Sequence, residues 1–384
     1  MKVQFDMENL PNITSFKQSI TRIVMNKQPI PTLGLLFGLL LFVLPSFAQQ
    51  AYVKPKLSNP NSWSLVLIPD PQTYMKFERN LGTFHTMISW IKENKDSLNT
   101  QFVLCTGDLV EQNDLLNPDG KQANQNSKQQ WTNVSSAFHR LNGLVPYVLA
   151  TGNHDYGHVS AEYRSTQYDK YFSSDQNPLN GAAIREVGPN LNGASTAVNA
   201  VYEFKTPHQQ KFLVMVLEFA PRNEVVEWAK KTVDQPKYAD HNVILLTHVY
   251  LDRNSKPINS QGYKIEDVNY GEALFEKLVK PSKNIRMVFS GHIGAPDDWD
   301  GHLGFREDKN AAGKSVAQMT FNAQAMGGGW HGNGGDGWLR YLEFLPDGKT
   351  VKVKTFSPLF AISPATRHLA YRTEKTQEFE FKLD

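Results

Sequence analysis

Cysteine is nearly absent from this chain of 384 residues, which contains Cys105 alone. One cysteine cannot form an internal disulfide, so the fold depends on its packed core. Cys105 lies inside an apolar run, and no histidine stands near it in the sequence to activate a thiolate. We therefore predict that Cys105 is a core side chain rather than a nucleophile.

An excess of charge of one sign is also absent, because 40 Lys and Arg residues face 38 Asp and Glu residues and leave a formal net charge of +2. No strong field attracts nucleic acid or an anionic membrane surface, so the sequence indicates neither as a partner. Apolar residues make up 40% of the chain, which is enough for a sizeable core. The length suits one large domain or two modest ones.

The sequence lacks an apolar run long enough to cross a membrane. The run Leu33–Leu44 is shorter than the roughly 20 residues that a spanning helix needs. Basic residues precede it, and the small residues Ser46 and Ala48 follow it, which is the order of a secretory signal. We predict that residues 1–48 are a signal peptide cleaved after Ala48, and that the protein is secreted or periplasmic.

Two alternatives stay open for this segment. The basic region is long, and a signal that starts at Met25 would have ordinary proportions. An uncleaved segment would anchor the protein to a membrane, whereas the cleaved form has no stable membrane span. Residues 49–62 are then a polar leader, and the folded domain covers residues 63–384.

Strands and helices alternate through most of this domain. Apolar runs typical of buried strands occur at 63–68, 102–105, 146–150, 211–218, 242–246 and 285–289. Helical spacing of apolar residues occurs at 80–94, 129–141, 223–233 and 270–280. This alternation predicts a layered α/β fold.

Two regions break the alternation. Beyond residue 310 only strands are predicted, at 315–321, 338–344, 351–356 and 377–383, and we expect them to form an antiparallel sheet that closes the domain. The residues 338–384 form its C-terminal strands. Residues 157–200 are rich in Tyr, Asn, Gly and Ser and show no period, so we interpret them as an insertion near a functional site. A passive surface loop is the alternative.

Five of the predicted strands are each followed by a residue that can bind a metal ion. These residues are Asp70, Asp108, Asn153, His248 and His292. Ligands of α/β sheets bind outside the carboxyl ends of the strands, so the five side chains can converge there. A single residue of this kind is more often a turn or cap residue. Five of them are hard to explain in this way, and Gly107, Gly152 and Gly291 let the backbone pass close to a ligand.

Here the chain resembles the calcineurin-like metallophosphoesterases, over roughly residues 63–356. The motifs of that family are Asp-x-His, Gly-Asp-x-x-Glu, Gly-Asn-His-Asp or -Glu, a lone His and Gly-His-x-His. The matching segments are Asp70-Pro71-Gln72, Gly107-Asp108-Leu109-Val110-Glu111, Gly152-Asn153-His154-Asp155, Thr247-His248 and Gly291-His292-Ile293-Gly294. The resemblance implies a layered α/β/β/α fold, in which two packed mixed sheets are flanked by helices.

The resemblance also implies a site for two divalent metal ions, which can be Mn, Mg, Fe or Zn. The implied ligands are Asp70, Gln72, Asp108, Asn153, His248 and His292, with Asp108 bridging the two ions. The chain departs from the family at Gln72 and Gly294, where histidines are usual, and both belong to the first ion. A first site poor in imidazole favours Mn²⁺ or Mg²⁺ and leaves its occupancy open. Gln324 follows a strand and is either a further ligand or a plain turn residue.

The implied reaction is hydrolysis of a phosphate monoester or diester, on a small-molecule or polymer substrate, by a metal-activated water. His154 is placed to protonate the leaving group, because the pKa of histidine lies near neutrality. Asp155 is the second candidate catalytic residue, and the anchoring of its loop is the alternative role. Trp330 and His331, in a glycine-dense stretch, form either a wall for the substrate or a tight connection.

A function of another class is compatible with the same motifs. The loss of two histidines from the first metal site would suit a metal- or ligand-binding protein on this fold whose catalysis is weakened. His154 argues for catalysis, because binding of a metal alone does not need it.

Overall fold

A computed structural model gives the structure of residues 52–191 and 196–384. The predicted signal peptide lies outside the described residues, so its presence and cleavage stay predictions. Within the described ranges, no helix combines the length and the apolar character that crossing a membrane requires.

Seven strands form the first sheet, in the order β13-β12-β11-β1-β2-β3, and β14 pairs with β12 beside β13. They are β1 (Trp63–Ile68), β2 (Thr100–Cys105), β3 (Tyr147–Leu149), β11 (Leu339–Phe344), β12 (Thr350–Phe356), β13 (Tyr371–Arg372) and β14 (Glu378–Lys382). The pairs β1–β2 and β2–β3 are parallel, whereas β11 is antiparallel to both β1 and β12. The sheet is therefore mixed.

The second sheet also has seven strands, in the order β4-β5-β6-β7-β8-β10-β9. They are β4 (Ile184–Val187), β5 (Ala200–Lys205), β6 (Lys211–Val216), β7 (Asn242–Leu246), β8 (Ile285–Ser290), β9 (Leu303–Lys309) and β10 (Ser315–Phe321). The four strands β6, β7, β8 and β10 run parallel. β5 and β9 pair antiparallel to β6 and β10, and β4 pairs antiparallel to β5. This sheet is mixed as well.

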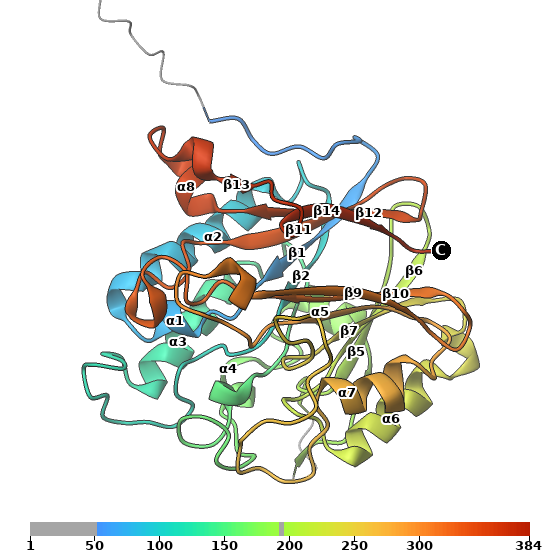
Figure 1. Ribbon diagram of the computed structural model, residues 1–384, viewed down its shortest axis with the longest axis horizontal. Helices are drawn as coiled ribbons and strands as arrows, with labels where there is room; N and C mark the ends of the chain where they lie inside the picture. Colours follow the sequence, from blue (N-terminus) through green and yellow to red (C-terminus); the bar gives the residue numbers. More distant parts are fainter. Residues whose placement is uncertain (1–51, 192–195) are drawn as a thin grey trace, which may run out of the picture. The chain divides into compact units, whose positions relative to one another are not determined.

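The two sheets pack face to face, because their strands are apolar on both sides. In β1, Leu65 and Leu67 join the core between the sheets, whereas Val66 and Ile68 join the core under the helices. The helices α2 (Leu81–Asn94), α3 (Ser127–His139) and α8 (Pro358–Ile362) cover the outer face of the first sheet. The helices α6 (Asn223–Val233) and α7 (Gly271–Leu274) cover the second (Figure 1). The predicted α/β/β/α layering is confirmed.

Local sequence signals place the helix ends. Asn126 caps α3 by accepting from the backbone N–H of Gln129, whose side chain accepts in turn from the N–H of Asn126. α6 has an acidic residue in its first turn and two lysines in its last, which complements the helix dipole. Cys105 is buried at the end of β2, as predicted for a core side chain.

The structure differs from the sequence prediction in several elements. β10 does not belong to a purely antiparallel sheet, because it runs parallel to β8. The strands β4 and β9 were not predicted, and the helix expected at 270–280 continues past α7 as a π-helical turn, Phe275–Val279. The aperiodic segment 157–200 contains two short helices, α4 (Tyr168–Tyr171) and α5 (Pro178–Ala183), besides β4.

The parallel strands fix where the candidate ligands lie. Asp70, Asp108 and Asn153 follow the ends of β1, β2 and β3. His248 and His292 follow the ends of β7 and β8 in the other sheet. The carboxyl ends of these strands, from both sheets, therefore place the five side chains at one edge of the sandwich.

Candidate metal centre

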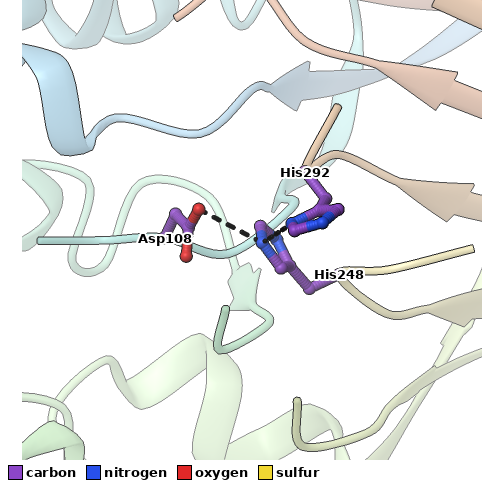
Figure 2. Close-up of side chains that lie close together, drawn as sticks. All are labelled: Asp108, His248 and His292. Atoms are coloured by element: carbon purple, nitrogen blue, oxygen red, sulfur yellow. Dashed lines mark hydrogen bonds and ion pairs between the residues drawn. The ribbon is translucent and has the colours of Figure 1, made fainter. Parts of the chain in front are cut away.

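Four atoms with lone pairs meet at this edge. His248 Nε2 lies 3.2 Å from Asp108 Oδ2 and 3.1 Å from Asn153 Oδ1. His292 Nδ1 lies 3.1 Å from the same Asn153 oxygen and 3.3 Å from His248 Nε2. Figure 2 shows the three residues whose ligand atoms form the compact group Asp108, His248 and His292.

The other polar atoms of these side chains are engaged outside the group, which determines where the protons are. His248 Nδ1 lies 2.8 Å from the carbonyl oxygen of Thr106 and donates to it. His292 Nε2 lies 3.3 Å from Gln261 Oε1, and Asn153 Nδ2 donates to Ser160 Oγ at 2.9 Å. In their neutral forms, both imidazoles therefore turn an unprotonated nitrogen toward the centre, which is how metal-binding histidines are held.

The spacing of the four atoms fits a cation between them. Two ligand atoms that each lie about 2.1 Å from one ion, at an angle between 90° and 109°, are about 3.0–3.4 Å apart. The four measured separations, 3.1–3.3 Å, fall in this range. A divalent cation would take the place of the proton that His248 holds here without a metal, so the donor set fits a divalent metal ion.

Two glycines leave room for the carboxylates. A Cβ atom on Gly152 would lie 2.1 Å from Asp108 Oδ1, and a Cβ on Gly291 would lie 2.1 Å from Asp70 Oδ1. No side chain fits at either position, which confirms the expectation that the backbone passes close to the ligands there.

The backbone is strained at two residues of this group. Asp108 has φ of 50° and His292 has φ of 74°, both in the left-handed region that residues other than glycine rarely adopt. Such conformations cost about 1–3 kcal/mol each and concentrate at functional sites. The Asp108 carboxylate is held from the other side, because its Oδ1 accepts from the backbone N–H of His154 at 3.0 Å.

Asp70 is fully buried beside this group. Its Oδ1 accepts from Thr106 Oγ1 at 2.6 Å, and its Oδ2 accepts from His292 N and Asn322 Nδ2, each at 2.7 Å. Burial raises the pKa of Asp70 to about 6, against the opposing charge of His248. Asp70 thus joins the loop of His292 to the end of β1. Both lone pairs of its Oδ2 are used by these bonds, and one lone pair on Oδ1 is left for a further ligand.

Two buried amide oxygens near the carboxylates have no hydrogen-bond partner. Gln72 Nε2 donates to Asp108 Oδ2 at 3.0 Å, while its Oε1 is unsatisfied. Gln324 Nε2 lies 3.4 Å from the His292 carbonyl oxygen, and its Oε1 is unsatisfied as well. A buried acceptor without a partner costs about 1–3 kcal/mol, and a cation bound beside it would remove this cost.

Trp330 explains why the chain has no histidine at position 294. A Cβ on Gly294 would lie 2.8 Å from the Trp330 ring and 3.2 Å from His302 Nε2. His302 is not a substitute ligand, because its Nε2 accepts from the N–H of Ala325 at 3.3 Å. Trp330 is 37% exposed, so its ring occupies the place of the absent side chain and still faces solvent.

The charges of the centre are strongly coupled. Burial works against the charged form of His248, but Asp108 and Asp70 raise its pKa to about 9. Burial and the charge of His248 lower the pKa of His292 to about 3. Burial raises the pKa of Asp108, yet the charges of His248 and His154 hold it below its usual range. The centre therefore keeps a carboxylate and a neutral imidazole side by side, which are ligand forms.

His154 and Asp155 lie next to the ligands with different surroundings. His154 Nδ1 donates to the Glu111 carbonyl oxygen at 2.7 Å, which leaves Nε2 free to carry a proton on the open side. Burial lowers its pKa, but Asp108 and Glu111 raise it by more. The fully buried Asp155 accepts from the N–H groups of Gly152 and Val110, at 2.7 and 3.1 Å. This arrangement supports an anchor between two ligand loops.

The prediction from the sequence did not include several residues that lie at the site. Asn322 follows β10 as the ligands follow their strands, so the same signal pointed to it. Thr106 and Ser160 act as neighbours of ligands and carry no pattern of their own. Gln261 lies in the long connection between β7 and α7, where no periodicity marks a position.

Comparisons with known proteins agree with this picture. The model of a family described as calcineurin-like phosphoesterase matches residues 64–296. The uncharacterized protein YvnB of Bacillus subtilis (strain 168) is 28% identical over 306 residues, which are 77% of this chain. The match covers 20% of YvnB, so the chain spans about one fifth of the length of that relative.

Two solved structures are similar at a lower level. GAP50, the anchor in the inner membrane complex of Plasmodium, is 12% identical with a TM-score of 0.41, over 84% of this chain and 89% of that one. A protein of Staphylococcus aureus assigned as a 5′-nucleotidase, in complex with alpha-ketoglutarate, is also 12% identical with a TM-score of 0.41. That match covers 84% of this chain and 54% of the other.

Proposed function

The chain belongs to the calcineurin-like phosphoesterase family, and on that premise we propose that it is a phosphoric ester hydrolase in which Asp108, Asn153, His248 and His292 hold a catalytic divalent cation. One observation carries the proposal. Four lone-pair atoms converge at 3.1–3.3 Å with their protons directed elsewhere. Two oxygen and two nitrogen ligands suit Mn²⁺, Fe²⁺ or Zn²⁺.

A second cation is proposed beside the first, with Asp70 and the shared Asp108 as its carboxylate ligands. The unsatisfied oxygen of Gln72 supports this position, and that of Gln324 offers a further ligand. All of these ligands are oxygens, which favours Mn²⁺ or Mg²⁺ there. This position is the first site of the family resemblance, and because it has no imidazole, we expect it to bind its ion more weakly than the site of His248 and His292.

When bound, the two cations would supply an activated water and neutralise charge on the phosphoryl oxygens. The residues of the chain provide the rest. His154 would donate its Nε2 proton to the leaving oxygen, and the Glu111 carbonyl oxygen orients the ring for this transfer. Asp155 would hold the loops of Asp108 and Asn153 at the required distance.

The proposed substrate is a phosphate monoester or diester, either a small molecule or part of a polymer. Trp330, partly exposed over Gly294, supports a wall on one side of the site, which is one of the two roles considered for the glycine-dense stretch. His331 lies in the same short helical turn, Gly329–His331. The site therefore offers an aromatic surface to the group that carries the phosphate.

Turnover by the purified chain tests the proposal. The chain is freed of metal, supplied with Mn²⁺, Mg²⁺, Fe²⁺ or Zn²⁺, and given 4-nitrophenyl phosphate or bis(4-nitrophenyl) phosphate. We expect hydrolysis of at least one ester with Mn²⁺, and loss of both turnover and bound metal in Asp108→Ala. Absence of turnover with every ion would instead favour a metal-binding protein whose catalysis has been lost.

We also propose that the chain is exported, because the basic, apolar and small residues of 1–48 stand in the order of a signal peptide. Expression of the full chain, followed by N-terminal sequencing of the exported form, tests this. A mature end at Gln49 is the expected result, and a chain that keeps residues 1–48 in the membrane fraction would support the anchor instead.

A further inference from the structure

A cavity of about 670 Å³ lies at one edge of the sandwich and shares no residue with the metal centre. Its lining comes from four parts of the chain, which are Arg253–Ser255, Asp300–Phe305, Arg340 and Lys375–Glu380. The volume is in the range of small-molecule sites. The lining includes Leu303–Phe305 of β9 and Phe379–Glu380 of β14, which belong to different sheets.

Arg340 lies at the bottom of this cavity and is 1% exposed. Its Nε donates to Thr355 Oγ1 at 3.0 Å, and its Nη2 donates to the Thr376 carbonyl oxygen at 2.7 Å. Nη2 also lies 3.3 Å from Gln377 Oε1. Every acceptor is neutral, and the described part of the chain gives Arg340 no carboxylate and its Nη1 no partner.

A buried guanidinium without a counterion is unusual, because desolvation of a charge is costly unless an opposite charge compensates it. Burial lowers the pKa of Arg340 to about 9. The rings of Phe321 and Phe379, at 4.4 and 5.6 Å, recover part of this cost by cation–π contact. These neutral neighbours hold the side chain in place and leave its charge without an opposite partner.

The mouth of the cavity adds two cations and two carboxylates. Lys375 is exposed, with no ion pair to any described residue, and Arg253 pairs only with the half-exposed Asp298 at 2.9 Å. Asp300 and Glu380 are the lining carboxylates. With Arg340, the lining carries three cations against two carboxylates, which leaves one positive charge in excess.

The walls between the mouth and Arg340 are apolar. Leu303 is buried, and the ring centroids of Phe305 and Phe379 lie 4.8 Å apart. The charge of Arg340, which has no carboxylate partner among the described residues, lies beside these apolar side chains and is complementary to a ligand with one negative charge and an apolar body. Nη1 of Arg340, which has no partner among the described residues, can donate its N–H bonds to a carboxylate.

We propose that this cavity is a second ligand site, which binds an organic monocarboxylate with its head group on Arg340 and its apolar body against Phe305 and Phe379. The site is separate from the metal centre and does not depend on the proposed metal ligands.

Calorimetric titration of the full metal-loaded chain with benzoate tests this, with the neutral isostere benzamide as the matched probe. A charged hydrogen-bonded pair predicts that benzoate binds about tenfold or more tightly than benzamide. Equal binding of the two compounds, or no binding of benzoate, would overturn the proposal.

Variants at the mouth keep the test independent of the buried arginine. Lys375→Glu should weaken benzoate binding about three- to fivefold, and Glu380→Lys should strengthen it by a similar factor. Lys314→Glu, an exposed control with the same change of net charge as Lys375→Glu, should leave it unaltered. An equal effect of the control and Lys375→Glu would mean that no local site exists.

Two further variants locate the bound carboxylate. Arg340→Met should abolish benzoate binding, with its circular dichroism spectrum as the check of folding, and the mouth variants decide the question if it does not fold. Asp108→Ala should bind benzoate with the same affinity as the unmodified chain. Loss of binding in Asp108→Ala would place benzoate at the metal centre and contradict a separate site.

Discussion

His248 Nε2 lies 3.1 Å from Asn153 Oδ1, and in the neutral form of the imidazole no proton lies between the two atoms. The histidine gives its only neutral-form proton to the Thr106 carbonyl oxygen, and the asparagine turns its amide protons toward Ser160. The two atoms come from different sheets, so the folding of the whole sandwich brings two acceptors into contact. A cation between them is the simplest way to stabilise this arrangement.

His154→Ala should lower turnover about 10²–10⁴-fold, because the leaving group would lose its proton donor. Bound metal should stay unchanged, since the ring nitrogens of His154 do not belong to the converging group. Steady-state rates together with metal analysis check this. His158→Ala, at an exposed histidine in the same loop, is the control and should keep full activity. Loss of metal in His154→Ala would make this residue a ligand instead.

Gly152→Ala should disable the centre without a change of any ligand. The new methyl group would lie 2.1 Å from Asp108 Oδ1 and 2.5 Å from the Asp108 backbone nitrogen, so the ligand has to move. A displacement of this size costs about 10²-fold in rate or more. Gly82→Ala, in α2 with open space around the Cβ position, is the control. It should keep activity and gain about 0.5 kcal/mol of stability. Full activity of Gly152→Ala would show that the carboxylate is not held where the structure places it.

The chain should accommodate a histidine at position 294 once the side chain of Trp330 is replaced by a smaller one. Gly294→His alone places a side chain against the Trp330 ring, so we expect lower stability and no gain in metal binding. With Trp330→Ala added, the imidazole has space and should strengthen the weaker metal site about tenfold. Titration of the metal-free protein with Mn²⁺ measures this. Equal affinity in the double variant and the unmodified chain would contradict a first site next to Gly294.

Acid stability should depend on Asp347, in the turn between β11 and β12. Its carboxylate accepts from Thr350 Oγ1 at 2.6 Å, and from the N–H groups of Thr350 and Lys349 at 2.8 and 2.9 Å. The side-chain bond to Thr350 and these backbone bonds lower the pKa of Asp347 to about 2. Because the folded pKa lies below the unfolded value, this stabilisation is complete above the unfolded pKa and is lost as the pH falls through the folded pKa.

Asp347→Asn should therefore reduce the free energy of unfolding at pH 6 by about 1 kcal/mol or less, since solvent screens this exposed turn. The difference from the unmodified chain should shrink as the pH falls from about 4 toward 2. Urea unfolding at several pH values measures it. A difference that stays constant over this range would mean that the charge of Asp347 contributes nothing.

The parts of the fold that could be predicted are those with one dominant signal. β1, β7 and β8 are continuous apolar runs because helices or a second sheet cover both of their faces, and α6 shows a clear helical period. β4 and β9 contain several charged residues, because each lies at an edge of the second sheet, and they were missed. The parallel pairing of β10 with β8 depends on partners distant in sequence, which no local pattern reports.

The candidate site also has residues that could be predicted from the sequence and residues that could not. The five metal-capable residues follow strands, so their convergence could be inferred from the order of strands and helices. The outer partners could not be inferred, because Gln261 and Asn322 reach His292 and Asp70 across the fold. The contact of Trp330 with Gly294 joins two loops and was equally hidden, although it gives the physical reason for the departure from the family motif.

Anomalous diffraction from crystals grown with Mn²⁺ tests the central claim most directly. We predict one strong peak about 2.1–2.3 Å from Asp108 Oδ2, Asn153 Oδ1, His248 Nε2 and His292 Nδ1, and a weaker second peak between Asp70 and Asp108. A structure that binds Mn²⁺ elsewhere, or that leaves the four atoms without a peak at saturating Mn²⁺, would contradict the account.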